Sequence, residues 1–183
     1  IDSQCKLAFT DGCVPTENLR GETIFEDLES VYGFIGKESP IISKPELTED
    51  SPVFILYTSG TTGLPKGTLY THKMLFWNSI NTSMSLVVNT ESRTVNVMPP
   101  FHTGGWNVLT TPFLHHGGYT CILKKFDPKS VLQLLESEEV TIFMGVPTML
   151  KMIADLPEFS TAKIDNLLYI IVGGEPMPIP LIE

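Results

Sequence analysis

Short apolar runs alternate with helix-like stretches along most of the chain. Runs typical of strands lie at 53–57, 94–98, 119–123, 140–144 and 167–172. Apolar residues at helical spacing follow them and predict helices over 72–87, 105–114 and 148–156, and one that begins at residue 128. Because strands that alternate with helices form parallel sheets with right-handed crossovers, we predict an α/β fold, a mainly parallel sheet flanked by helices.

Local residue choices mark several helix ends. Thr71 is a candidate N-cap for the helix from His72 to about Val87, and Asp127 precedes a proline at the first helical position. His115 and His116 stand near a helix end that Gly117 terminates, where the helix dipole favours them, so we interpret them as helix-end residues and not as ligands.

Residues 1–50 form a less regular lead-in, whereas 51–183 carry the α/β pattern. Within the lead-in we expect a strand at 6–10, a short helix within 23–34 and a connector at 39–52. Residues 53–57 are expected to be a buried strand, and the last residues, PIPLIE, could start a further helix.

Unusual loops follow four of the predicted strands. They read YTSGTTG, PPFHTGG, GVPT and GGEPMP. In a parallel sheet these loops leave from the carboxyl edge, which is where open α/β sheets bind ligands. We therefore predict one composite site, with 59–66, 102–106 and 173–176 on the same edge.

The loop YTSGTTGLPKG has the composition of an anion-binding loop. Its glycines let the backbone approach a ligand, its hydroxyls and N–H groups suit anionic oxygens, and its lysine adds a charge for a phosphate. The candidate binding residues are Thr58, Ser59, Gly60, Thr61, Thr62, Gly63 and Lys66. The spacing is not that of a Walker A loop, which argues against a P-loop-like nucleotide hydrolase.

Composition narrows the classes of function. The net charge of −9 argues against a nucleic-acid partner, and no apolar run approaches the ~18 residues of a transmembrane segment. Three cysteines without metal-like spacing favour a reduced, cytoplasmic compartment. The four histidines form no zinc ligand set, so we predict no protein-held metal.

The string TSGTTGLPKG resembles the phosphate-binding signature of the adenylate-forming (AMP-binding) superfamily, acyl-CoA synthetase or long-chain fatty-acid–CoA ligase type. PPFHTGGW resembles the segment between the acyl pocket and the pantetheine channel, and GGEP resembles the adenine loop. The resemblance implies a catalytic His102, substrate contacts by His102, Thr103, Gly104 and Trp106, and nucleotide contacts by Gly173, Gly174, Glu175 and Pro176.

The resemblance also implies a reaction. A carboxylic acid attacks ATP, with Mg²⁺ on the phosphates, and coenzyme A then takes the acyl group. His102 stands where amino-acid-activating domains usually carry an aspartate, so a fatty or aryl acid is the better match. An amino-acid adenylation domain and a non-catalytic nucleotide-binding module remain as alternatives.

The resemblance covers 6–183, part of a large N-terminal domain. The sequence has no Tyr-Gly-x-Thr-Glu or Thr-Gly-Asp segment, and the C-terminal domain with its catalytic lysine is absent from it. We therefore expect a single partial domain that is inactive on its own, and whose exposed apolar surface could drive self-association.

Overall fold

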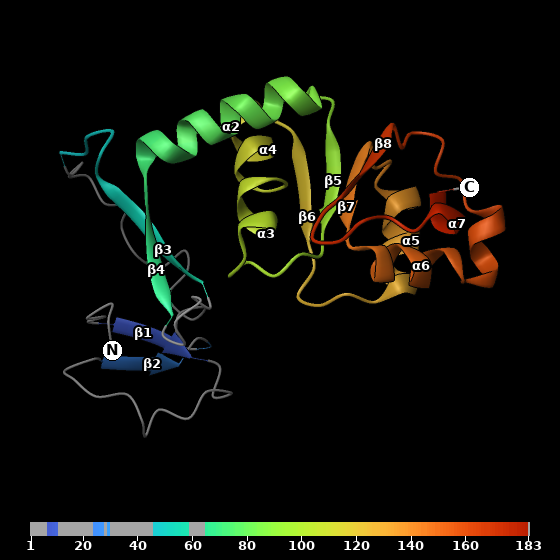
Figure 1. Ribbon diagram of the computed structural model, residues 1–183, viewed down its shortest axis with the longest axis horizontal. Helices are drawn as coiled ribbons and strands as arrows, with labels where there is room; N and C mark the ends of the chain where they lie inside the picture. The colour runs from blue at the N-terminus through green and yellow to red at the C-terminus, as the bar shows by residue number, and fades with distance from the viewer. Residues whose placement is uncertain (1–6, 11–23, 28, 30–45, 59–64, 183) are drawn as a thin grey trace. The chain divides into compact units, whose positions relative to one another are not determined.

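The computed structural model describes residues 7–10, 24–27, 29, 46–58 and 65–182 (Figure 1). The chain divides into two compact units. One contains Ile1–Thr48 and Thr58–Gly67, and the other contains Glu49–Tyr57 and Thr68–Glu183.

In the first unit, β1 (Leu7–Thr10) pairs in parallel with β2 (Ile24–Asp27). The predicted strand at 6–10 is confirmed at 7–10. The helix predicted within 23–34 is wrong at 24–27, and all but one of residues 28–34 lie outside the described part of the chain. A short apolar run cannot by itself separate helix from strand, and here pairing with a segment far along the chain decides it.

Strand β3 (Pro52–Thr58) pairs with β4 (Lys66–Thr71). So few residues separate the two strands that the pair is a hairpin, because a parallel crossover needs a dozen or more. The expectation of a buried strand in the parallel sheet is wrong, since Val53 and Ile55 are 41% and 42% exposed. Strand β4 was not among the predicted strands. It follows β3 closely in the sequence and pairs with it, so β3 does not join the parallel strands.

Helix α2 (His72–Leu86) begins and ends where predicted. The Thr71 hydroxyl accepts a hydrogen bond from the N–H of Met74 at 3.3 Å, and Val87 closes the helix in the left-handed region, with φ of 50°. The buried residues of α2 are Ser79 and Ser83. Small side chains let α2 approach α4 (Thr111–His116), where the Ser79 hydroxyl lies 2.9 Å from Nδ1 of His115.

The second unit contains the predicted parallel strands. β5 (Arg93–Asn96) pairs in parallel with β6 (Tyr119–Ile122), and β7 (Ile142–Gly145) pairs in parallel with β8 (Tyr169–Val172). β5 and β7 adjoin, so the strands lie in the order β6–β5–β7–β8 (Figure 1).

Helices cover both faces of these strands. On one face, α5 (Pro128–Ser137) and α6 (Pro147–Ala154) pack on Val95 and Phe143, and a 3₁₀ helix (Pro157–Thr161) follows α6. On the other face, the buried side chains Leu109 and Phe113 meet Ile142 and Met144. Phe143 of β7 thus packs in one core cluster, while its neighbours Ile142 and Met144 pack in the other, because successive side chains of a strand point to opposite faces. The chain continues into α7 (Ile179–Ile182), as the sequence suggested.

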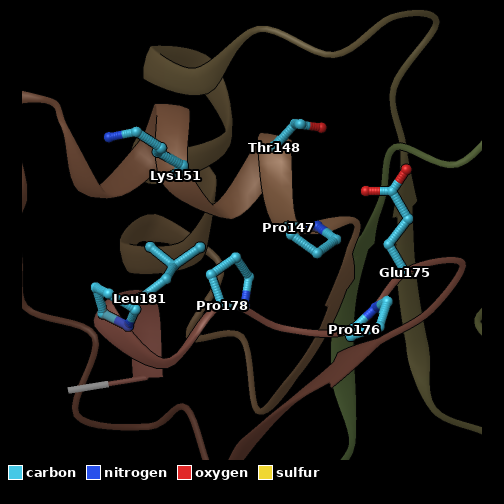
Figure 2. A pocket seen from close by; sticks show the side chains of 8 residues that line it. Pro147, Thr148, Lys151, Glu175, Pro176, Pro178 and Leu181 are labelled. Atoms are coloured by element: carbon cyan, nitrogen blue, oxygen red, sulfur yellow. The ribbon is translucent and has the colours of Figure 1, made fainter.

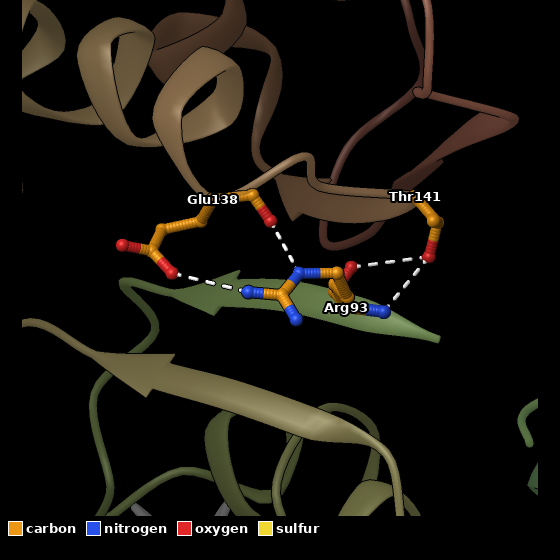
Figure 3. A network of polar contacts seen from close by, with 3 residues as sticks. All are labelled: Arg93, Glu138 and Thr141. Atoms are coloured by element: carbon orange, nitrogen blue, oxygen red, sulfur yellow. Dashed lines mark hydrogen bonds and ion pairs between the residues drawn. The ribbon is translucent and has the colours of Figure 1, made fainter. Parts of the chain in front are cut away.

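An arginine ties the beginnings of β5 and β7 together (Figure 3). The Arg93 guanidinium donates from Nε to the backbone carbonyl of Glu138 and from a terminal nitrogen to its carboxylate at 3.2 Å. The N–H of Thr141 donates to the carbonyl of Arg93 at 2.9 Å, and the Thr141 hydroxyl accepts from the N–H of Arg93 at 2.9 Å. The guanidinium lies 4.4 Å from the Tyr119 ring centroid.

The helix predicted over 105–114 is two short helices, α3 (Thr103–Asn107) and α4. Two features break it, hydrogen bonds to the Gly105 carbonyl and a proline. The carbonyl of Gly105 accepts hydrogen bonds from Asn96 Nδ2 at 2.6 Å and from the Thr110 hydroxyl at 2.8 Å. Pro112 has no N–H to continue a helix, so a new helix begins there. Gly117 ends α4 with φ of 76°, as predicted.

Candidate functional site

Two of the three predicted site segments meet at the carboxyl edge of the strands. Residues 102–106 follow β5, and 173–176 follow β8, which confirms that these two segments share an edge. The Cε methyl of Met144 lies between them. A Cβ added to Gly104 would stand 3.3 Å from that methyl, and one added to Gly173 would stand 3.1 Å away.

His102 is the N-cap of α3. Its Nδ1 accepts a hydrogen bond from the N–H of Gly104 at 3.2 Å. An accepting Nδ1 needs its lone pair, so the neutral ring carries its proton on Nε2. The imidazole is an exposed side chain at the edge, and its Nε2–H is oriented by the cap as a hydrogen-bond donor.

Asn96, a residue that the sequence analysis did not single out, holds the same segment from below. It is 2% exposed, and its amide donates to the carbonyl of Gly105 and to the hydroxyl of Thr110 at 2.9 Å. Its carbonyl oxygen accepts from the N–H of Met98 at 2.9 Å. A polar residue inside a buried strand is the signal that could have revealed this role, because buried side-chain amides almost always make hydrogen bonds.

Gly105 sits too close to the preceding backbone for any side chain. A Cβ there would lie 2.5 Å from the carbonyl oxygen of Pro99 and 2.8 Å from that of Met98. The tight return of the chain over residues 98–105 therefore requires glycine, and it brings Gly105 back to Asn96 at the end of β5.

Trp106 lines a cavity of about 210 Å³. The other lining residues are Phe54, Leu56 and Pro100. Phe54 meets the Trp106 ring edge-on with centroids 5.9 Å apart, and it stacks on Tyr70 at 4.9 Å. The walls are apolar and half of the lining residues are aromatic, as expected of a pocket for an uncharged organic group.

The segment after β8 turns sharply at Gly174, where φ is +86°. Glu175 and Pro176 then border a second pocket of about 380 Å³ against α6 (Figure 2). The Lys151 ammonium and the Glu175 carboxylate lie at opposite sides of this pocket. Lys151 is engaged with Asp155 at 2.8 Å, so its charge is already paired.

The phosphate-loop candidates all belong to the compact unit that contains Thr58–Gly67. Residues 59–64, which include Ser59, Gly60, Thr61, Thr62 and Gly63, lie outside the described residues. Thr58 ends β3 and Lys66 begins β4, and the Thr58 hydroxyl donates to the carbonyl of Lys66 at 3.4 Å. The prediction that this loop shares the edge of the other two segments stays a prediction.

In the described part of the chain, no group of three or more histidine, cysteine, aspartate or glutamate side chains could hold a metal ion. Among the same residues, no helix combines the length and apolarity needed to cross a membrane.

Comparison with known proteins identifies the family. The AMP-binding enzyme family matches residues 2–183, and the chain belongs to it. The chain is 36% identical over 132 residues to a feruloyl-CoA synthase of an Amycolatopsis species, which covers 72% of this chain and 27% of the relative. It is 35% identical over 135 residues to the long-chain-fatty-acid–CoA ligase FadD13 of Mycobacterium tuberculosis, covering 73% of this chain and 26% of the relative.

A solved structure shares the fold as well. The chain resembles ATP-bound MatB from Rhodopseudomonas palustris with a TM-score of 0.76 and 27% identity, over 87% of this chain and 32% of that one. The chain thus spans about a quarter of the length of these curated relatives. The family and the partial domain predicted from the motifs are confirmed.

Proposed function

We propose that the chain is part of an ATP-dependent carboxylic acid–CoA ligase that activates a fatty or aryl acid. The observation that carries the proposal is the meeting of 102–106 and 173–176 around Met144 at one edge, in a chain of the AMP-binding family. The similar feruloyl-CoA and long-chain-fatty-acid–CoA ligases support this reaction class, and ATP-bound MatB supports the nucleotide.

In the proposed reaction, a carboxylate oxygen attacks the α-phosphorus of ATP and pyrophosphate leaves, which gives an acyl-adenylate. The coenzyme A thiol then loses its proton and attacks the acyl carbon, and AMP leaves with the electrons of the broken C–O bond. Both steps join anionic partners, so positioning and charge neutralisation are the protein's main contributions.

We assign the residues as follows. The Nε2–H of His102 is the donor that orients the carboxylate, and the apolar cavity beside Trp106 takes the tail of the acid. The backbone of 173–176 takes the adenine, and the loop 58–63 with Lys66 takes the phosphates. When bound, Mg²⁺ would enter with ATP and would supply positive charge for its phosphates beside that of Lys66.

Three residues that the resemblance implies for this reaction do not occur in the sequence. The magnesium glutamate, the ribose aspartate and the catalytic lysine implied by the resemblance are not in this sequence. We propose that residues outside it supply them in the full-length protein, and that the 183-residue chain alone is inactive.

The test measures pyrophosphate release by the full-length protein with fatty acids, aryl acids and amino acids. Release with fatty or aryl acids is expected, and release with amino acids alone would overturn the proposal. His102→Asn keeps a capping side chain but lacks the Nε2–H donor, so kcat/KM for the acid should fall about 100-fold. His115→Asn, at the end of α4, is the matched control and should retain activity. The isolated 183-residue chain, assayed in parallel, should release none.

A further inference from the structure

We propose that Met144 is a positioning residue that couples the segment 102–106 to the segment 173–176, so that each ligand binds more tightly when the other is present. The inference rests on the proposed function for the identity of the two ligands, an acid at the first segment and a nucleotide at the second. Neither the sequence motifs nor the family assignment gives Met144 a role.

The geometry around the Met144 methyl carries the proposal. Met144 is 8% exposed, near the carboxyl end of β7, and packs in the same core cluster as Leu109 and Phe113. Its Cε fits between Gly104 and Gly173 because neither residue has a side chain, and a Cβ on either would lie within 3.3 Å of it. Both glycines carry φ values that alanine can adopt, so space and not backbone conformation keeps these positions small.

This contact gives a mechanical link from one segment to the other. Close-packed interiors transmit small displacements because they contain few voids. A nucleotide that fixes 173–176 therefore also fixes the Met144 methyl, which in turn limits the movement of Gly104. The N–H of Gly104 holds Nδ1 of His102, so the position of the proposed Nε2–H donor depends on Met144.

The first experiment uses Met144→Leu in the full-length protein. Leucine preserves volume closely enough for the core to fold but has no atom at the position of the Met144 Cε methyl. Acid binding is measured with and without a non-hydrolysable ATP analogue. In the wild type the analogue should tighten acid binding at least about fivefold, a usual size for coupling between sites. In Met144→Leu the ratio should fall close to one, with the KM values of acid and ATP both raised.

Ile142→Leu is the matched control. Ile142 is 1% exposed, on the same strand face and in the same core cluster, but it does not lie against either glycine. Its substitution should leave the coupling ratio unchanged even if it lowers thermal stability. A wild type without coupling, or an equal loss of coupling in both variants, would overturn the proposal.

The second experiment is a double-mutant cycle with Gly173→Ala and Met144→Ala. The new Cβ at 173 would stand 3.1 Å from the methyl of Met144 and would push it aside by a few tenths of an ångström, so Gly173→Ala alone should lower the melting temperature and weaken ATP binding. Removing the methyl makes room, so the double variant should recover part of both losses. Additive effects of the two substitutions would show that the contact is not shared and would overturn the proposal.

The readouts separate this inference from the proposed function. If the full-length protein activates no acid, the proposed function fails. The double-mutant cycle, measured by melting temperature and by nucleotide binding, still decides whether Met144 joins the two segments. If activation is normal but the cycle is additive, the function stands and the role of Met144 falls.

Discussion

At the scale of single residues, two cations that look equivalent in the sequence, Arg93 and Lys151, make contacts of different strength. Arg93 binds a backbone carbonyl as well as the Glu138 carboxylate and lies over an aromatic ring. Lys151 pairs with Asp155, four residues on, and both side chains are more than 60% exposed. The planar guanidinium of Arg93 bonds a fixed backbone acceptor and loses little side-chain entropy for each hydrogen bond. The solvent-exposed pair of Lys151 and Asp155 must order two side chains for a weak, screened attraction.

We predict that Arg93→Lys lowers the free energy of unfolding by about 1 kcal/mol, the usual net value of one such hydrogen bond. Lysine keeps the charge but cannot donate to both the carbonyl and the carboxylate of Glu138. Urea unfolding followed by circular dichroism gives the value. Lys151→Gln is the comparison and should shift the midpoint by less than the error, and equal effects from both substitutions would contradict the argument.

At the scale of elements, α5 shows how one cap can make helix stability depend on pH. The Asp127 carboxylate accepts from the N–H of Ser130 at 2.8 Å, and hydrogen bonding with Ser130 is the main reason why the pKa of this carboxyl lies below its ordinary value of 3.8. Because the folded pKa is depressed, the stabilisation is present above that ordinary value and is lost as the pH falls through the folded pKa.

We predict that Asp127→Asn, an uncharged cap, brings the urea midpoint below that of the wild type at pH 7, and that the difference shrinks as the pH falls below about 3.8. Asp127→Ala removes the cap and should unfold earlier than either protein at pH 7. Midpoints measured between pH 3 and 7 test this. A constant difference between wild type and Asp127→Asn across that range would exclude the carboxylate as the cause.

The elements that the sequence predicted well are those with local signals. Thr71, Asp127 and Gly117 are at the helix ends where the sequence put them, because capping depends on neighbouring residues. The errors arose where distant contacts decide. The strand at 24–27 depends on β1, and the break near residue 108 depends on an amide from Asn96 in β5.

The candidate site divides in the same way. The motif around His102 and the turn at Gly174 could be predicted, because residue type and order carry them. Met144 could not, since its role comes from two glycines that lie 69 positions apart in the sequence and meet only in the folded chain. Asn96 was detectable in principle as a polar residue in an apolar strand.

At the scale of the whole molecule, α2 presents large apolar side chains outward. Phe76 is 48% exposed, Trp77 55%, Met84 77% and Val87 70%, while the same helix buries two serines. Such apolar surface favours association in water.

We predict that the 183-residue chain self-associates in a concentration-dependent way and that the double variant Trp77→Lys with Met84→Lys shifts it towards monomer. Sedimentation velocity over a range of concentrations gives the distribution. Asn81→Lys, an exposed polar residue on the same helix, adds charge without removing apolar area and should change little. A chain that is monomeric at every concentration would refute the prediction.

The strand order β6–β5–β7–β8 also has a consequence for the order in which the chain folds during synthesis. β5 and β6 are synthesised first and can pair at once, whereas β7 reaches β5 only after α5 has been made. Until then one side of β5 is an unpaired edge with apolar neighbours, a state prone to join other chains. The Tyr169 hydroxyl in β8 donates to the carbonyl of Leu86 at the end of α2. This hydrogen bond joins residues that are 83 positions apart. The slowest step of folding is therefore expected to be the arrival of β7 and β8, and a chaperone would have most effect in that interval.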